Sequence, residues 1–496
     1  MKHVLAIDEG TTGVTCVVVA SDGAIRGRGY HEITQHFPQP GWVEHDASEI
    51  FDRVISAARA AIEQAGVVPD AIGITNQRET VVVWDRTTGK PLARAIVWQD
   101  RRTAERCREL SPHASKITMI SGLPLDPYFS ATKLELLLRD PAIAAKASAG
   151  QVLVGTIDTW LIWKLTGGEV HATDPTNASR TLLFDIGERR WSDYLCALFS
   201  VPISVLPAVR PSSGDFGEAG AEWFGTPIPI RGVAGDQQAA LFGQGCVLPG
   251  QGKNTYGTGA FLLLNTGSAR PTPGEGILAT VACDDSGGYA YALEGSIFIA
   301  GAAIQWLRDG LSIISAAAES ESLAASLASN DGVYFVPALT GLGAPHWAPE
   351  ARGTIVGLTR GTTRAHLARA ALEAMAYGTA EVLTAMRERS GVTFDRLRVD
   401  GGATENDWLM QFQADVIGVP VERADVSATT ALGAAGLAGI ASGVWRDSEQ
   451  FLSTRGYTSF TPRIDSAKRA ELMAGWTRAV GAALAWARHE VPETIE

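Results

Sequence analysis

Short apolar runs alternate with polar turns along the first 110 residues, and their order predicts a sheet flanked by helices. The polar turn DEGTTG lies between two apolar runs near the N-terminus, which predicts a β-hairpin. Apolar residues then recur at helical spacing from Ser48 to Gln64. The elements expected in this region are strands over 4–7 and 14–20, a helix over 48–64, strands over 71–75, 80–84 and 95–98, and a helix over 103–110. Alternating strands and helices indicate an α/β fold.

A second unit of the same kind is expected after about Pro249. It opens with the polar turn NTYGTG at 254–259, followed by an apolar strand over 261–264. Helices are expected over 299–307, over 366–386 and from Asp407 onward, and a strand over 397–399 runs into the polar segment 400–406. Each half thus begins with an apolar strand and a Gly/Thr turn. We expect two related α/β domains, residues 1–249 and 250–496, facing a cleft.

Composition narrows the class of protein. With 496 residues, 46% hydrophobic and 19% charged, the chain can bury sizeable cores, which excludes disorder as its main state. The net charge of -12, from 42 basic and 54 acidic side chains, argues against a nucleic-acid partner. The five cysteines form no CxxC pair, and the sequence has neither an export signal nor an apolar run of membrane-spanning length. We therefore expect a soluble cytoplasmic protein, with the apolar stretch 432–444 in its core.

The two Gly/Thr turns are candidate phosphate sites. A bound phosphate needs backbone N–H groups that approach closely, which favours glycine, and hydroxyls that donate beside them. Gly10, Thr11 and Thr12 meet this need in the first turn, and 257–259 (GTG) meets it in the second. A single such turn is more often an ordinary hairpin, but one at the head of each domain makes phosphate binding a stronger candidate. The sequence contains no GxxxxGK[ST], GxSxG or HExxH motif.

Two aspartates end predicted strands beside these turns. Asp8 closes the first strand, and Asp236 lies in VAGDQQAALFG at a strand-to-helix junction. One carboxylate can hold Mg²⁺ through water while a second accepts the proton of an attacking hydroxyl, so the pair suits phosphoryl transfer. A turn residue at Asp8 and a helix N-cap at Asp236 remain alternatives.

Longer segments carry a family resemblance that covers nearly the whole chain. They read IDEGTTG, GITNQRET, IVWQDRRT, DPYFSATK, GTIDTWLIWKLT, TDPTNASRTLLF, GVAGDQQAALFGQ, KNTYGTGAFLLLNTG, YALEGSIFIAGAAIQWLRD, PALTGLGAPHW, GLTRGTT and RVDGGATENDWLMQFQAD. In this order they resemble the glycerol kinases of the FGGY carbohydrate kinase family. The resemblance implies two actin-like, ribonuclease H-type α/β domains with ATP in the cleft between them.

The resemblance also implies site residues. Those of the polyol pocket are Arg78, Glu79, Trp98, Tyr128, Asp236, Gln237 and Phe261. Those of the nucleotide site are Thr11, Thr12, Gly13, Thr258, Gly301, Gln305, Gly402 and Asn406. Asp236 would be the catalytic base, and Asp8 would hold Mg²⁺ through water. Without the resemblance, composition favours a solvated ion pair for Arg78 and Glu79, and plain core aromatics for Trp98 and Phe261.

The chain departs from the family pattern at three places. Where the family usually reads DQGTTS with an arginine two residues later, this sequence has Glu9, Gly13 and Thr15, so a cation near the transferred phosphate is missing. Leu136 replaces a usual aromatic residue, which we interpret as variation in the core. In regulated bacterial members a glycine-rich loop with an arginine binds a sugar bisphosphate, but Ala219–Pro229 contains no arginine.

These observations support the hypothesis of an ATP-dependent kinase that converts glycerol to sn-glycerol 3-phosphate. Its expected partners are glycerol and ATP with Mg²⁺, in a homodimer or homotetramer without nucleic acid and not embedded in a membrane. A kinase for another polyol or ketose of the same family is the nearest alternative. A non-catalytic, actin-like nucleotide-binding switch is the alternative of a different class, made conceivable by Thr15.

Overall fold

The N-terminal hairpin forms the centre of the first large sheet in the computed structural model, which describes residues 1–274, 276–426 and 428–488. β1 (His3–Glu9) pairs antiparallel with β2 (Gly13–Ala20) and parallel with β5 (Ala71–Asn76). The six strands run in the order β13-β14-β5-β1-β2-β3. The outer strands are β3 (Ile25–Glu32), β14 (Ile228–Gly235) and β13 (Glu218–Ala219). The predicted hairpin and the strand over 71–75 are confirmed.

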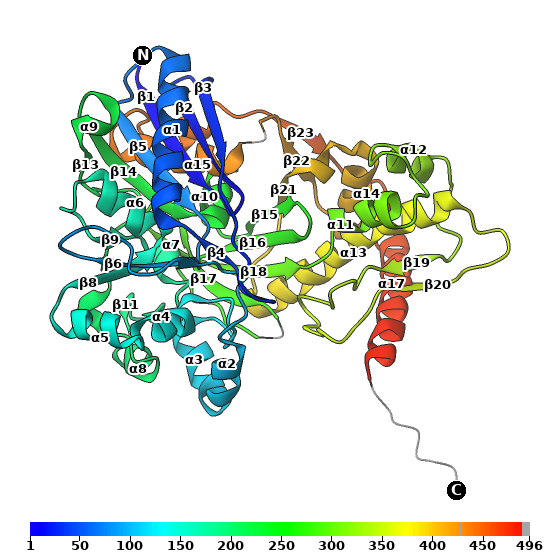
Figure 1. Ribbon diagram of the computed structural model, residues 1–496. Helices are drawn as coiled ribbons and strands as arrows, with labels where there is room; N and C mark the ends of the chain where they lie inside the picture. The colour runs from blue at the N-terminus through cyan, green and yellow to red at the C-terminus, as the bar shows by residue number, and fades with distance from the viewer. Residues whose placement is uncertain (275, 427, 489–496) are drawn as a thin grey trace, which may run out of the picture.

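Helices cover both faces of this sheet, which explains why its strands are almost continuously apolar. On one face lies α1 (Ala47–Ala65), which begins at the N-cap Asp46 and ends at Gly66 in the left-handed conformation. Its apolar side packs into the core formed with β2 and β3 (Figure 1). On the other face lie α10 (Asp236–Gly243) and α15 (Thr429–Ala441).

The second large sheet repeats the central arrangement of the first. β15 (Gln251–Tyr256) pairs antiparallel with β16 (Ala260–Gly267) and parallel with β21 (Arg396–Asp400), as β1 does with β2 and β5. Its seven strands run in the order β17-β18-β16-β15-β21-β22-β23. The remaining strands are β17 (Leu278–Cys283), β18 (Tyr289–Ile297), β22 (Val421–Ala424) and β23 (Tyr457–Phe460). The repeated order of hairpin and parallel strand confirms the predicted pair of actin-like α/β units.

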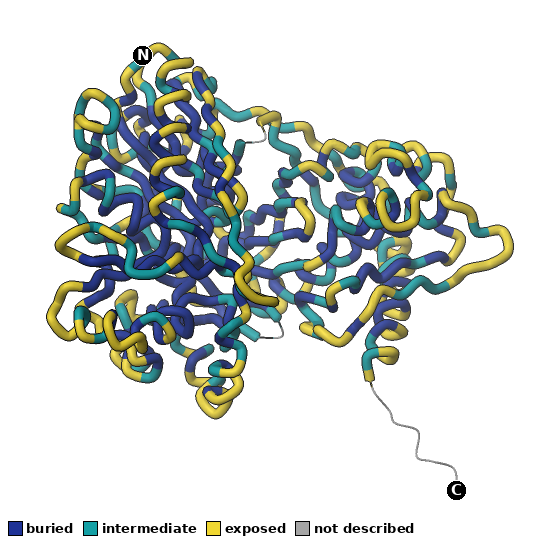
Figure 2. The backbone as a smooth tube through the Cα atoms, in the orientation of Figure 1, coloured by how far each residue is buried: buried dark blue, intermediate teal, exposed yellow. Residues whose placement is uncertain are grey.

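The long helix α13 (Arg364–Ser390) is buried along the second sheet and, with its neighbours, forms the other main core (Figures 1 and 2). The helices packed around it are α11 (Gly301–Gln305), α12 (Glu319–Ala325), α14 (Asp407–Ile417) and α17 (Ser466–Ala487). α11 continues into a π-helical turn, Trp306–Gly310, where the sequence predicted one continuous helix over 299–307. The predicted turn over 254–259 is also too long, because β15 extends to Tyr256.

A four-stranded sheet extends the first unit in the order β4-β7-β6-β8. Its strands and packed helices are β4 (Glu44–His45), β6 (Val81–Asp85), β7 (Ala95–Ile96), β8 (Val152–Thr156), α4 (Ser130–Leu138) and α6 (Ile157–Leu165). The remaining helices are α2 (Ala104–Glu109), α3 (Ala114–Ser121), α5 (Pro141–Ser148), α7 (Pro175–Ala178), α8 (Asp193–Leu198), α9 (Ala221–Phe224) and α16 (Ser448–Leu452). Two-residue and three-residue strands pair as β9 (Ala172–Thr173) with β12 (Ala208–Val209), β10 (Phe184–Asp185) with β11 (Arg190–Trp191), and β19 (Tyr334–Val336) with β20 (Thr354–Val356).

The helix α15 belongs to the second half of the sequence but packs on the first sheet. It follows β22 in the sequence, yet it packs on β1, β5 and β14 of the first sheet and against α10. The proposed division between residues 249 and 250 therefore separates the two large sheets but not the layers that cover them. The prediction that 432–444 lies in the core is confirmed for α15, which is buried along most of its length.

The cysteines and the helices of the structure bear on the expected cellular environment and on the expected absence of a membrane span. All five cysteines are free and buried, so none forms a disulfide. No helix in the described part of the chain combines the length and the apolar character needed to cross a membrane.

Candidate active site

The first phosphate turn closes the hairpin between β1 and β2. The Gly10 amide donates to the Gly13 carbonyl oxygen at 3.0 Å, which closes the turn. Thr11 Oγ1 accepts a hydrogen bond from Trp98 Nε1 at 2.8 Å, whereas the Thr12 side chain is exposed. The turn thus leaves the Thr12 hydroxyl open to a ligand, while Thr11 connects the turn to Trp98, one of the predicted polyol residues.

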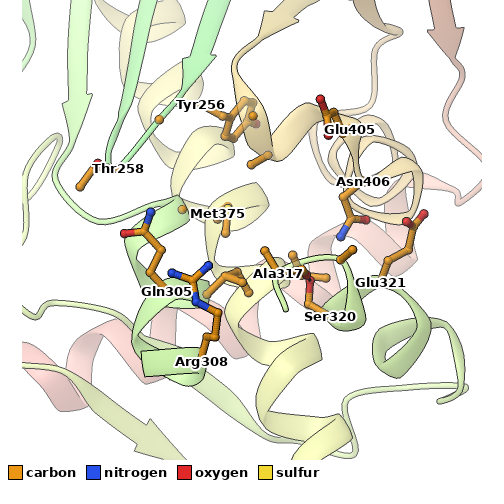
Figure 3. Close-up of a pocket in the computed structure, with 17 residues that line it drawn as sticks. Tyr256, Thr258, Gln305, Arg308, Ala317, Ser320, Glu321, Met375, Glu405 and Asn406 are labelled. Atoms are coloured by element: carbon orange, nitrogen blue, oxygen red, sulfur yellow. Dashed lines mark hydrogen bonds between the residues drawn. The ribbon is translucent and has the colours of Figure 1, made fainter. Parts of the chain in front are cut away.

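The second turn lies at one end of a cavity of about 530 Å³ in the second unit (Figure 3). Gly257 N donates to the Gly259 carbonyl oxygen at 2.8 Å, and Ala300 N donates to the Thr258 carbonyl oxygen at 2.8 Å. These bonds fix the turn against the start of α11. The predicted nucleotide residues that line the cavity are Thr258, Gly301, Gln305, Gly402 and Asn406. The structure therefore brings together five residues that span almost 150 positions of the sequence, in a volume typical of small-molecule sites.

The wall opposite this turn is formed by the segment after β21. Gly401 has a φ of +93°, and a Cβ there would overlap the backbone of Tyr256. At Gly402 a Cβ would meet no atom within 4 Å, so the chain is open to the cavity at this residue. Asn406 caps α14 by accepting from Leu409 N at 2.8 Å, and it lies across the cavity from Gln305 and Arg308 (Figure 3).

Thr11, Thr12 and Gly13 lie outside the lining of this cavity. They belong to the first sheet, on the same edge as Asp8 and Asp236. The predicted nucleotide residues thus form two groups: one pocket in the second unit, and the phosphate turn of the first unit.

The two candidate carboxylates lie close enough to interact. Burial, and then the negative charge of Asp236, raise the pKa of the Asp8 carboxyl to about 7. Asp8 pairs across the sheet with Thr15 and Thr75, so it belongs to β1 and not to a turn. Asp236 is the first residue of α10, and Gly235 takes the N-cap position, so the N-cap alternative for Asp236 is wrong.

Arg78 contacts the candidate base directly. Its Nε lies 3.1 Å from Asp236 Oδ1. Arg78 and Glu79 are each only 2% exposed, so the alternative of a solvated pair is wrong. Glu79 Oε1 accepts from Arg180 Nε at 2.8 Å, and burial raises the pKa of its carboxyl. Two of the predicted polyol residues, Arg78 and Glu79, therefore lie in a buried charged network next to Asp236.

Aromatic side chains form one wall beside this network. The rings of Trp98 and Tyr128 meet edge to face, with centroids 5.4 Å apart. Trp98 is half-buried and bonded to Thr11, which distinguishes it from a core aromatic. Phe261, also half-buried, lies on β16 opposite Thr255 of β15 and Ser296 of β18.

Gln237 is linked to the second unit through a buried lysine. Lys253 Nζ on β15 donates to Gln237 Oε1 and, at 2.9 Å, to Thr255 Oγ1. Burial lowers the pKa of the Lys253 ammonium to about 8. A cation thus lies behind Asp236 and Gln237, next to the strand that carries Phe261.

Both halves of the chain match the domains of a known protein family. Residues 3–243 match the N-terminal domain, and residues 252–442 the C-terminal domain, of the FGGY family of carbohydrate kinases. The chain belongs to this family. It is 54% identical over 493 residues to "Glycerol kinase" of Dechloromonas aromatica, with 98% of each chain covered. It is 52% identical to "Glycerol kinase 2" of Thermotoga maritima, covering 98% of this chain and 99% of that relative.

A solved FGGY kinase shares the whole fold. The crystal structure of Plasmodium falciparum glycerol kinase with ADP superposes with a TM-score of 0.93, at 37% identity and with 98% of each chain covered. A xylulose kinase from Lactobacillus acidophilus superposes with a TM-score of 0.88 at 20% identity, which extends the likeness of fold alone. The predicted family and fold are thereby confirmed.

The departures of this FGGY kinase from the family pattern have structural counterparts. Thr15 lies directly beside Asp8 on the neighbouring strand, so the usual arginine at this position would have placed a cation next to that carboxylate. A Cβ at position 13 would meet the Tyr30 hydroxyl oxygen at 2.7 Å, which explains why glycine suits a turn flanked by this tyrosine. Leu136 is 41% exposed on α4, so its interpretation as a core position is wrong.

Sequence reasoning missed four charged residues of the network and the cavity. They are Arg180, Lys253, Glu294 and Arg308. Glu294 interrupts the mostly apolar and buried strand β18, and such a charge in a buried strand must find a partner. That signal could have identified Glu294, although not its partners.

Proposed function

We propose that this FGGY kinase transfers the γ-phosphoryl group of ATP to glycerol and forms sn-glycerol 3-phosphate in glycerol catabolism. The observation that carries the proposal is 54% identity over nearly the full length to a relative named glycerol kinase. The buried polar network around Arg78 and Glu79, next to an aromatic wall, supports it, because a polyol needs hydrogen-bonding partners and an apolar surface for its C–H groups.

In the proposed reaction, Asp236 accepts the proton of the terminal hydroxyl as its oxygen attacks the γ-phosphorus. A new O–P bond forms, the bond between the γ-phosphorus and the bridging oxygen breaks, and ADP leaves with the electron pair. Arg78 forms an ion pair with Asp236, with Nε 3.1 Å from Asp236 Oδ1, and its positive charge stabilises the ionised carboxylate that accepts the proton. Trp98 and Tyr128 supply the wall that orients the carbon chain of glycerol.

The two phosphate turns divide the nucleotide between them in this proposal. Adenosine occupies the cavity lined by Gly301, Gln305 and Asn406. The Plasmodium falciparum relative solved with ADP supports an adenine nucleotide as the ligand. Thr258 and the turn Thr11–Gly13 then donate to the phosphates from opposite sides. Water is excluded when the units close around the transferring group.

Asp8 fits the role of a magnesium ligand. Its half-buried carboxyl takes part in no hydrogen bond or ion pair found among the described residues, and its proximity to Asp236 favours a cation between them. No group of three or more His, Cys, Asp or Glu side chains in that part of the chain could hold a metal ion by itself. Magnesium bound with ATP would therefore be held mainly by phosphate oxygens, and it would offset their charge.

We also propose a reducing cytoplasmic location and a homodimeric or homotetrameric state. Five free, buried cysteines support the first proposal. Light scattering of the purified chain measures the second.

A coupled assay of ADP release tests the function. Glycerol, erythritol, xylulose and dihydroxyacetone are compared at saturating ATP and Mg²⁺, and we expect the highest kcat/KM with glycerol. A higher kcat/KM with xylulose would assign the chain to another sugar or polyol. Binding of ATP without turnover of any acceptor would favour the non-catalytic switch.

A further inference from the structure

A buried carboxylate from the second unit holds the arginine of the polyol site. Glu294 lies on β18 and is 1% exposed, whereas Arg78 follows β5 in the first unit. Glu294 Oε2 lies 2.5 Å from Arg78 Nη1, and Oε1 lies 3.0 Å from Arg78 Nη2. These two bonds form a bidentate pair, which fixes both the position and the plane of a guanidinium group.

A second arginine shares the same carboxylate. Arg180 Nη2 donates to Glu294 Oε1 at 3.0 Å, and Arg180 Nε donates to Glu79 Oε1 at 2.8 Å. Arg78, Arg180, Glu79 and Glu294 thus form a buried cluster in which two positive charges face two negative charges. Burial alone would raise the pKa of the Glu294 carboxyl, but Arg180 and Arg78 lower it to about 2.

The remaining contacts of Arg78 show how Glu294 positions its guanidinium group. Glu294 engages Nη1 and Nη2, and Nη1 also lies 3.3 Å from Gln238 Oε1, while Nε lies 3.1 Å from Asp236 Oδ1 and 3.7 Å from Glu79 Oε1. Without the bonds to Glu294, the flexible arginine side chain would have several rotamers available, and its distance from Asp236 would no longer be fixed. A buried pair that loses one partner also leaves an uncompensated charge.

We propose that Glu294 is a positioning residue for the polyol site, supplied by the second unit, and that it acts through Arg78. The inference rests on the proposed function for the identity of the acceptor. It implies that glycerol binds well only when both sheets are correctly placed, because the arginine of one is aimed by the carboxylate of the other.

The main test is Glu294→Asp, which keeps the charge but withdraws the carboxylate by about 1.5 Å, the length of one C–C bond. The shorter side chain cannot reach both arginines, so we expect KM for glycerol to rise about tenfold or more, with KM for ATP within about twofold of the wild type. In the Arg78→Met background the same change should add less than about twofold. An unchanged KM for glycerol, or an equal effect with and without Arg78, would overturn the proposal.

The matched control is Glu422→Asp on β22 of the same sheet. Glu422 also contacts two arginines, Arg396 at 3.2 Å and Arg398 at 3.0 Å, but it lies outside the described network. Both KM values should stay within about twofold of the wild type. A rise in KM for glycerol equal to that of Glu294→Asp would show that any weakened ion pair in this sheet has the same effect, and would overturn the proposal.

Two further measurements keep the test decisive. If Glu294→Asp does not fold, Glu294→Gln combined with Arg180→Gln removes one charge of each sign, and it should give the same selective rise in KM. A crystal structure of the folded variant should show Arg78 moved away from Asp236. An unmoved Arg78 overturns the proposal whatever the acceptor is, whereas absence of glycerol turnover in the wild type contradicts only the proposed function.

Discussion

Arg78 illustrates how much of the site can be predicted at the scale of single residues. Its motif identifies it as a polyol ligand that could donate two hydrogen bonds to adjacent hydroxyls. In the structure its guanidinium group already donates to Glu294 and Gln238 and forms an ion pair with Asp236. The motif could not indicate this, because Glu294 lies 216 positions further along the chain. Residue types near a motif were predictable, and the partners that fix them were not.

Asp236→Asn should remove turnover and leave ATP binding nearly unchanged. The carboxamide preserves the shape of the side chain but cannot accept the proton, and a general base contributes about 10²- to 10⁴-fold to the rate. Steady-state ADP release gives kcat, and calorimetry gives the affinity for ATP.

Asp193→Asn is the control for this substitution. Asp193 is likewise the first residue of a helix, α8, but it is exposed and forms an ion pair with the exposed Arg190, at 3.2 Å. Its kcat should equal that of the wild type. If Asp236→Asn retained more than about a tenth of the wild-type kcat, Asp236 would not be the base.

At the scale of elements, regular patterns were predictable where local sequence and burial agree. The helix over 48–64 and the strand over 71–75 were found within one or two residues, because α1 is amphipathic and β5 is apolar throughout. β15 was partly mistaken for a turn, because Lys253, Asn254 and Thr255 are polar. The hydrogen-bond partners of these side chains include residues of distant elements, such as Thr379 of α13 for Asn254. The local sequence therefore does not indicate that this polar segment is a buried strand.

The contact between α10 and α15 leads to a prediction at the same scale. A Cβ at Gly433 would overlap the carbonyl oxygen of Ala239, so glycine permits the two helices to approach closely. Gly433→Ala should lower the free energy of unfolding, because overpacking costs about 1–3 kcal/mol while the gain in helix propensity is about 1 kcal/mol. Urea denaturation followed by circular dichroism measures the change.

Gly481→Ala in α17 is the matched control. It is also a helical glycine, but a Cβ there would meet no atom within 4 Å. Its stability should rise by about 0.4–1 kcal/mol. Equal stabilisation by both substitutions would mean that the two helices can separate without cost.

At the scale of the whole molecule, the repeated sheets were predictable as an architecture but their coverings were not. Two Gly/Thr turns after apolar strands indicated two related units, and β1-β2-β5 and β15-β16-β21 have the same connections. That α15 would pack on the first sheet is a consequence of the tertiary fold, because its Gly- and Ala-rich sequence suits any closely packed layer. The same holds for Glu294, whose role depends on how the two units meet.

The surface of the first unit and the charge of the whole chain lead to the last prediction, which is that fructose 1,6-bisphosphate does not inhibit this kinase. A bisphosphate brings several negative charges to a protein of net charge -12, so it needs a local group of free cations and N–H donors. Two arginines lie near the segment Ala219–Pro229, and both are engaged. Arg231 pairs with Asp215, and Arg59 donates to the carbonyl oxygens of Trp223 at 2.8 Å and Glu222 at 3.1 Å. The rate of glycerol-dependent ADP release should therefore stay constant as the bisphosphate is titrated into the millimolar range at fixed Mg²⁺. Saturable inhibition that Arg231→Ala or Arg59→Ala removes would show that one of these arginines leaves its partner to bind the bisphosphate.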